Sequence, residues 1–216
     1  MKSEEELENF CLSAFLAFSG GLQDAYTYNT RGHVFANAQT GNIVLMSQHL
    51  MNGHLDKVLN YLLPLLAFMA GIFVAEQLQN KKSFFHRIHW KGKILLLEII
   101  ALFIVGFIPK ELNFVANMLV SFACALQVQS FQRLRGNPFA STMCIGNMKG
   151  GTAAFSSFIR EKKIEKLKIS TYYFGIILVF ALGAGFGGLL SIHYGYLSIW
   201  CSCIILSIPL YLIHHR

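Results

Sequence analysis

The amino-acid sequence predicts an all-α fold, a polytopic bundle of membrane helices, and three observations lead to it. Hydrophobic residues make up 54% of the chain and charged residues 13%, whereas about 25% of the residues of a soluble domain are charged. Apolar stretches recur, and about 20 apolar residues cross a bilayer as a helix. Short motifs of the first half return in the second. We expect about six transmembrane helices plus two broken or re-entrant segments, arranged as a two-fold inverted internal repeat.

Six stretches are apolar enough to be predicted as spanning helices. The last two lie within residues 171–215, which contain no Asp, Glu, Lys or Arg, and His193, Tyr194 and Gly195 mark the turn between them. The acidic N-terminus has the wrong charge for a secretory signal peptide, so we expect the first stretch to be retained. The six predicted spans are 10–28, 58–78, 94–108, 114–132, 171–191 and 196–213.

Two further segments, 34–51 and 139–158, are less apolar and are interrupted by polar residues and glycines. Composition alone leaves open whether they cross the membrane fully. Basic tracts at 81–93 and 160–168 should both be cytoplasmic, because cytoplasmic loops retain Lys and Arg. They would face opposite sides if 139–158 crossed completely. We therefore expect a broken or re-entrant segment there, with its backbone shielded from lipid by protein.

An internal repeat relates the two halves of the chain. Leu22-Gln23 and Phe35-Ala36 recur at the same spacing as Leu126-Gln127 and Phe139-Ala140, and Gly41-Asn42 recurs as Gly146-Asn147 after a one-residue insertion. The predicted organisation is one integral membrane domain with a first repeat at 1–110 and a second at 111–216. Three crossings per half, an odd number, require the second half to be inverted. Both termini are then cytoplasmic, and the broken segments open to opposite sides.

Polar residues inside the predicted membrane region are the candidates for function. A carboxylate within a span, such as Asp24, is costly and usually faces a cavity or a partner. The segment from Asn37 to Asn42 gathers amides and a hydroxyl around Gly41, and a helix that begins there would direct free backbone N–H groups at a polar solute. The alternative is structural, because Thr and Asn are equally common as N-caps of helices.

Two glutamates and one lysine in apolar surroundings also have alternative explanations. Glu76 and Glu98 flank the basic loop, where pairing with Lys81 or Lys93 is favoured over proton coupling. Lys149 could meet an anionic solute or reach the cytoplasmic surface.

The sequence argues against enzymatic, metal and nucleic-acid functions. It contains no zinc-ligand spacing, nucleophile elbow, phosphate loop or dinucleotide fingerprint, so we expect no catalytic residues, no metal site and no cofactor. The five cysteines lie in or beside apolar segments, where they are expected to be small core residues. The net charge of +7 accompanies no nucleic-acid-binding motif, and the positive-inside rule accounts for it.

Two motifs make the chain similar to a known family. Gly21-Leu-Gln-Asp24-Ala25, followed by Phe35-Ala-Asn37-Ala-Gln-Thr40-Gly41-Asn42, resembles the YoaK family of bacterial multispanning membrane proteins, whose function is unknown. The resemblance continues through Gln127, Gln129 and Arg133 to Gly146-Asn147, where Ile145 replaces the threonine common in the family. It implies a multi-pass protein of the bacterial inner membrane and supplies no activity. The candidate substrate-binding residues are Gln23, Asp24, Asn37, Gln39, Thr40, Gly41, Asn42, Gln127, Gln129, Gly146 and Asn147.

The hypothesis that follows is a small-solute transporter or channel with a polar site at the repeat interface. Its partners would be the lipid bilayer and a small polar or ionic solute, with a homo-oligomer left open. The alternative is a non-transporting membrane scaffold or accessory subunit, in which the polar segments only fold the bundle.

Overall fold

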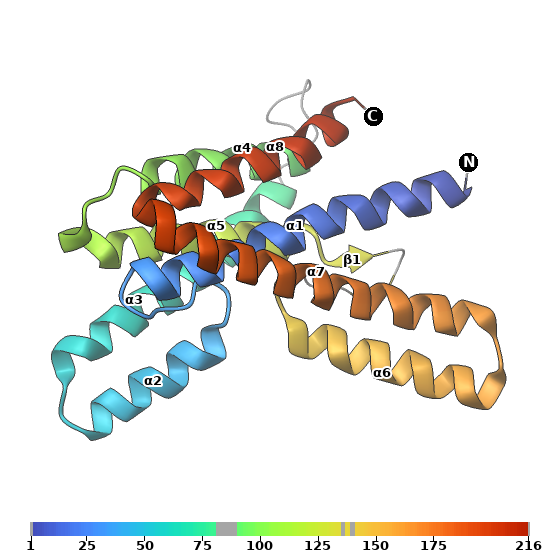
Figure 1. Cartoon of the computed structure of the whole chain (residues 1–216), viewed down its shortest axis with the longest axis horizontal. Helices are drawn as coiled ribbons and strands as arrows, with labels where there is room; N and C mark the ends of the chain where they lie inside the picture. The colour runs from blue at the N-terminus through green and yellow to red at the C-terminus, as the bar shows by residue number, and fades with distance from the viewer. Residues whose placement is uncertain (1, 81–89, 135–136, 139–140, 216) are drawn as a thin grey trace.

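The chain folds into a bundle of α-helices, and the computed structural model describes residues 2–80, 90–134, 137–138 and 141–215 (Figure 1). A two-residue antiparallel ladder joins β1 (Arg133–Leu134) to β2 (Asn137–Pro138). Short 3-10 turns, η1 (Lys110–Leu112) and η2 (Gly195–Ile199), precede α5 and α8. The described helices are α1 (Lys2–Thr30), α2 (Gln39–Met51), α3 (Leu55–Asn80), α4 (Trp90–Val105), α5 (Asn113–Ser130), α6 (Cys144–Glu161), α7 (Ile164–Tyr194) and α8 (Trp200–His214). The predicted all-α fold is confirmed.

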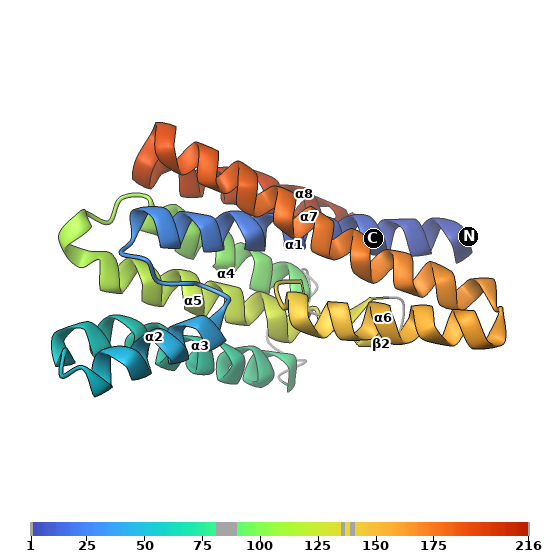
Figure 2. The same cartoon turned by 60° about the horizontal axis from the view of Figure 1, so that its bottom comes forward.

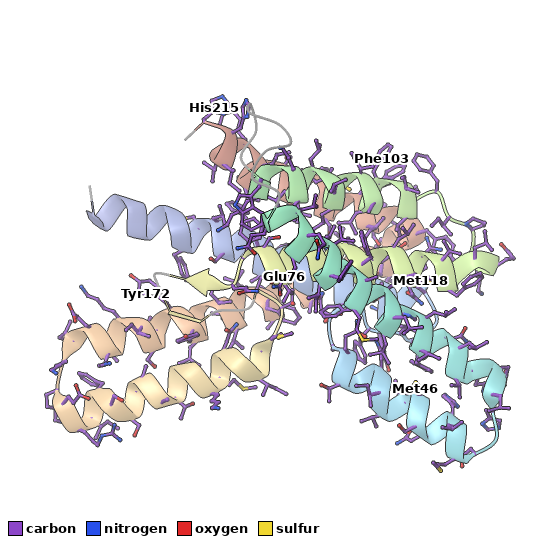
Figure 3. All side chains as sticks on the ribbon, turned by 180° about the vertical axis from the view of Figure 1, so that it is seen from behind. Met46, Glu76, Phe103, Met118, Tyr172 and His215 are labelled. Atoms are coloured by element: carbon purple, nitrogen blue, oxygen red, sulfur yellow. The ribbon has the colours of Figure 1, made fainter. Side chains whose placement is uncertain are left out.

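Large apolar side chains cover the outside of the bundle. Phe103, for example, is 51% exposed and projects outward from α4 (Figure 3). Within the described residues, three helical stretches are long and apolar enough to cross a membrane, namely Leu55–Gln79, Lys110–Ser130 and Ile164–His214. The third contains α7 and α8, which turn at Gly195 with a φ of 54°. This is the turn predicted at 193–195, and glycine adopts that positive φ at little cost.

The helices of the two halves pair reciprocally. α1 packs along α7 and α3 packs along α5, while α4 lies between α5 and α8. The short helices α2 and α6 form hairpins with α3 and α7, respectively. These hairpins extend from the middle of the bundle toward its opposite ends (Figures 1 and 2). Each half thus contributes a long helix, a short helix and two further helices in the same order.

Glycines allow the long helices to approach backbone to backbone. A Cβ atom added to Gly21 of α1 would lie 2.1 Å from the Phe180 carbonyl oxygen of α7, and one added to Gly183 would lie 2.1 Å from the Phe18 carbonyl oxygen. A Cβ on Gly71 of α3 would lie 2.6 Å from the Phe122 carbonyl oxygen of α5. Small residues at such positions stabilise helix pairs in membranes by close packing.

The two segments predicted as broken have a simpler form in the structure. In each, a short non-helical stretch leads into a continuous helix, α2 or α6. Gly41 and Asn42 therefore lie in the first turns of α2, and Gly146 and Asn147 lie in the first turn of α6. These glycine and asparagine residues therefore do not interrupt a helix. The interruption comes just before, at residues 33–38 and 141–143.

A buried arginine fixes one end of the bundle. Arg31, only 1% exposed, follows α1, and its guanidinium donates hydrogen bonds to the carbonyl oxygens of Val105 (2.9 Å) and Ile108 (2.8 Å). It also donates to Asn113 Oδ1 (3.1 Å), and its Cζ lies 4.1 Å from the centre of the Tyr196 ring. A cation at the C-terminus of α4 is favourable because the free carbonyl groups there carry partial negative charge. The guanidinium thereby ties α1 to α4, α5 and η2.

Candidate functional site

A cavity of about 730 Å³ lies where the two non-helical stretches meet. α1 and α7 form one wall, Phe68 of α3 contributes a ring, and the first turns of α2 and α6 enter from either side. Its size falls in the usual range of small-molecule sites, about 300–1,000 Å³. The described lining residues are Asp24, Ala25, Tyr28, Asn29, Phe35, Asn37, Ala38, Gln39, Thr40, Phe68, Thr142, Met143, Cys144, Ile145, Gly146, Phe180, Ala184 and Gly188.

Asp24 holds the first non-helical stretch in place. Its Oδ1 atom accepts a hydrogen bond of 2.7 Å from the backbone N–H of Asn37, and the neighbouring N–H groups of Ala36 and Ala38 also face the carboxyl group. The Asn37 side chain in turn donates to the Gly20 carbonyl oxygen (3.2 Å). Backbone N–H groups outside a helix must find acceptors at membrane depth. Asp24 therefore both stabilises this backbone and presents a carboxyl group at the cavity wall.

The Asn42 side chain closes the turn that leads into α2. Asn42 is fully buried, and its Oδ1 accepts a hydrogen bond from the Phe35 N–H (3.0 Å) while its Nδ2 donates to the Phe35 carbonyl oxygen (2.7 Å). Nδ2 also donates to Gln39 Oε1 (2.9 Å). All the hydrogen bonds found for this amide are therefore structural. They hold the Phe35 ring against Gly41, where a Cβ atom would lie 3.1 Å from that ring.

The second half supplies the opposite wall. Thr142 packs so closely on α1 that a Cβ atom added to Gly20 would lie 2.3 Å from its methyl group. Gln127 of α5 donates a hydrogen bond of 2.7 Å to Ser141 Oγ. It thereby holds the non-helical stretch before α6, as Asp24 holds the non-helical stretch before α2. Gly146 lines the cavity, with no atom within 4 Å of the place where a Cβ would lie.

Two helix N-termini and one carboxyl group set the electrostatics of the cavity. Neither α2, preceded by Ala38, nor α6, preceded by Met143, has a side-chain hydrogen bond at its N-cap. Free N–H groups at a helix N-terminus are equivalent to about half a positive charge. At α2, however, the N–H groups of Gln39 and Gly41 are already bound by the carbonyl oxygens of Asn37 and Ala38. Among the lining residues that the structure describes there is no Lys or Arg, and Asp24 is the one carboxyl group.

Five of the eleven predicted site residues line the cavity: Asp24, Asn37, Gln39, Thr40 and Gly146. Of the others, Gly41 and Asn42 support the Phe35 turn, and Gln23 and Gln127 are buried between helices. Gln129 donates a hydrogen bond to Glu76, and Asn147 is 2% exposed behind the lining residues of α6. The structure thus places four predicted polar residues of the first half and Gly146 of the second half around one cavity, and the remaining six predicted residues outside its lining.

Several lining residues were not predicted. Thr142 and Cys144 lie in the segment 139–158 and could have been selected by their position. Tyr28 and Phe35, whose rings stack at 4.9 Å between centroids, give no signal that separates them from lipid-facing aromatics. Phe68 and Phe180 come from distant helices, and only the packing of α3 against α2 and α5 and of α7 against α1 brings them to the site.

Comparisons with known proteins agree with this description. The sequence profile of a family described as "Protein of unknown function (DUF1275)" matches residues 12–212. The chain is 26% identical over 188 residues to the UPF0700 transmembrane protein YoaK of Bacillus subtilis (strain 168), which covers 78% of this chain and 81% of that protein. No solved structure matches. The resemblance stated from the sequence motifs is confirmed, and with the apolar helices it identifies an integral membrane protein.

Proposed function

Because the chain belongs to the DUF1275 family of proteins of unknown function, its relatives supply no activity, and we propose from the cavity that it is a small-solute transporter or channel. The observation that carries this proposal is the cavity of about 730 Å³, built at the meeting point of two non-helical stretches from the two halves. In membrane proteins, non-helical backbone is tolerated where it is buried in protein or lines a cavity, and transporters place substrate sites at such interruptions.

The proposed arrangement in the membrane is an inverted repeat with six crossings. α1, α3, α4, α5, α7 and α8 are the crossing helices, and α2 and α6 are short helices that open to opposite sides. The reciprocal pairing of α1 with α7 and of α3 with α5 is what a two-fold axis between the halves would produce. The basic residues of the α6–α7 hairpin then lie on the cytoplasmic side of a bacterial inner membrane, as the positive-inside rule requires.

The lining indicates an uncharged, partly apolar solute. Tyr28, Phe35, Phe68 and Phe180 offer aromatic faces, while amides and hydroxyl groups offer hydrogen bonds to an uncharged polar group. An anion would meet no Lys or Arg among the described lining residues, and a cation would meet only the Asp24 carboxyl group, which already accepts hydrogen bonds from backbone N–H groups. Planar solutes that carry polar groups fit both sets of contacts.

The test is uptake and binding by the purified protein in proteoliposomes. The probes are radiolabelled nucleosides and nicotinamide, which are uncharged and carry a planar ring, with benzylamine and benzoate as charged comparators. The informative variant is Gly146→Leu, because the new side chain enters open space at the cavity. The matched control is Gly185→Leu on α7, where a Cβ atom also meets nothing within 4 Å and the residue is exposed.

We expect an uncharged probe to be bound and taken up, Gly146→Leu to reduce this at least about tenfold, and Gly185→Leu to leave it unchanged. Equal loss in both variants would argue that the effect is general destabilisation. Absence of binding and uptake for every probe class would refute the transport proposal.

A membrane scaffold remains the second candidate, because one set of observations favours it. Asp24 and Asn42 both use their side chains to hold backbone, as a purely structural polar cluster would. In a scaffold, Gly146→Leu would fill the cavity without changing any binding or uptake of the probes. The same pair of variants therefore separates the two functions.

A further inference from the structure

A second buried carboxyl group lies away from the cavity wall. Glu98, near the middle of α4, is fully buried, and its Oε1 atom accepts a hydrogen bond of 3.2 Å from Gln23 Nε2. Its Oε2 atom has no hydrogen-bond partner among the described residues. The hydrogen-bond partner of Glu98 is therefore an amide inside the bundle, whereas Lys81, named above as a possible partner, lies outside the described residues. Burying a carboxyl oxygen without a partner costs several kcal/mol, about 2–7, which points to a bound species.

A chain of polar contacts joins Glu98 to the cavity. Gln23 Oε1 accepts a hydrogen bond of 2.7 Å from Cys124 Sγ, and the Cys124 thiol also faces the Asn37 side chain. Asn37 lines the cavity, and its backbone N–H is bound by Asp24. Asn37 Oδ1 is likewise buried without a hydrogen-bond partner among the described residues. The contacts run from α4 through α1 and α5 to the first non-helical stretch.

The surroundings of Glu98 select a proton over a metal cation. A hard metal cation takes about six oxygen ligands, and no group of three or more potential metal-binding side chains is found among the described residues. A proton needs only the free Oε2 atom. We infer that Glu98 is a proton-binding site coupled to the solute cavity through Gln23, Cys124 and Asn37, an inference that rests on the proposed transport function for its role.

The coupling follows from the chemistry of the Gln23 amide. With Glu98 ionised, the amide donates from Nε2 to the carboxylate, as in the structure. When Glu98 takes up a proton from bulk water on Oε2 and its carboxyl group turns so that the protonated oxygen faces Gln23, that oxygen becomes a donor, which is satisfied when the amide rotates and offers Oε1. Rotation removes the acceptor of the Cys124 thiol and so changes the contact at Asn37. Loss of the proton to bulk water on the other side restores the first arrangement.

Other titratable groups surround this site and must be distinguished from it. Cys124 on α5 and Cys203 on α8 both lie close enough to Glu98 for its charge to act on them. Asp24 on α1 acts on Cys124 from the cavity side. Arg31 lies at the C-terminal end of α4, where it binds the Val105 carbonyl oxygen.

Infrared difference spectroscopy of the reconstituted protein tests the inference without a solute. The signal is the carboxylic-acid C=O stretch, followed as the pH is changed. We expect one component of this band to titrate in the wild type, to be lost in Glu98→Gln and to remain in Glu76→Gln, the control for a partly buried glutamate. Glu98→Asp should keep a titrating component at a shifted frequency, which covers the case in which Glu98→Gln fails to fold.

Coupling is tested with Gln23→Leu, which removes the amide and should change both the frequency of the Glu98 component and the pH at which it appears. Identical spectra for wild type and Glu98→Gln at every pH would overturn the proton site. A Gln23→Leu spectrum equal to the wild type would overturn the coupling. A titrating Glu98 component in a protein that binds and transports no probe would sustain the proton site while the transport proposal fails.

Discussion

Replacing Gly21 by alanine tests the close packing of α1 on α7, which forms one wall of the cavity. The added Cβ atom would lie 2.1 Å from the Phe180 carbonyl oxygen and 2.8 Å from the Ala184 nitrogen, whereas even a close C···O contact needs about 3.3 Å. Both neighbours are backbone atoms, so neither can rotate away. α7 must therefore move outward by roughly 1 Å, which separates Gly183 and Gly187 from α1 as well.

The magnitude follows from two opposing terms. Overpacking costs about 1–3 kcal/mol, and the upper end applies here because backbone atoms are displaced. Alanine favours the helix over glycine by about 1 kcal/mol. The net destabilisation is about 2 kcal/mol, and for a chain of this size each kcal/mol lowers the Tm by about 2–4 °C. We expect the Tm of Gly21→Ala to fall by roughly 4–8 °C.

The assay is thermal unfolding of the purified protein in detergent at one scan rate, with Gly185→Ala as the matched control. Gly185 lies on α7 with nothing near its Cβ position, so only the helix-propensity term remains and the Tm should rise by about 2–4 °C. If Gly21→Ala is as stable as the wild type or more stable, α1 and α7 do not meet as described. The reasoning about the cavity wall would then be wrong.

Two further predictions concern the turn that leads into α2 and the access of water to the cavity. Asn42→Ala leaves the N–H and C=O groups of Phe35 without their side-chain partner and should destabilise the protein by about 2–4 kcal/mol, measured as a fall in Tm. A Tm that does not fall below that of Gly185→Ala would contradict the assigned hydrogen bonds. In single-cysteine variants, Cys144 at the cavity should react with a membrane-impermeant maleimide and the buried Cys124 should not. Equal protection of both thiols would mean that water does not reach the cavity.

The membrane fold and the polar segments could be predicted from residue chemistry alone. The stretches predicted at 58–78 and 171–191 lie within α3 and α7, because an apolar stretch of this length has few alternatives to a helix in lipid. Asp24, Asn37 and Thr40 were selected because polar groups are costly among apolar neighbours, and that cost does not depend on the details of packing. All three line the cavity.

The assignment of individual roles could not be predicted. Asn42 and Asn37 are both asparagines of one short segment, yet one holds the Phe35 backbone and the other faces the cavity. Glu98 was expected to reach a lysine at the loop, and instead it points inward to Gln23. In the first case the choice depends on the path of the non-helical stretch before α2, and in the second on the rotation of α4 about its axis, and both are set by contacts with segments distant in the sequence.

The sequence by itself determined that this chain crosses a membrane and that polar residues interrupt its apolar stretches in two segments, because both properties follow from the transfer of single residues between water and lipid. Only the tertiary structure decided which polar groups meet at one cavity. Phe68, Phe180 and Thr142 reach it because glycines let α1 and α7, and α3 and α5, touch at the backbone. Such contacts between distant segments depend on the mutual fit of two surfaces, which no local pattern records.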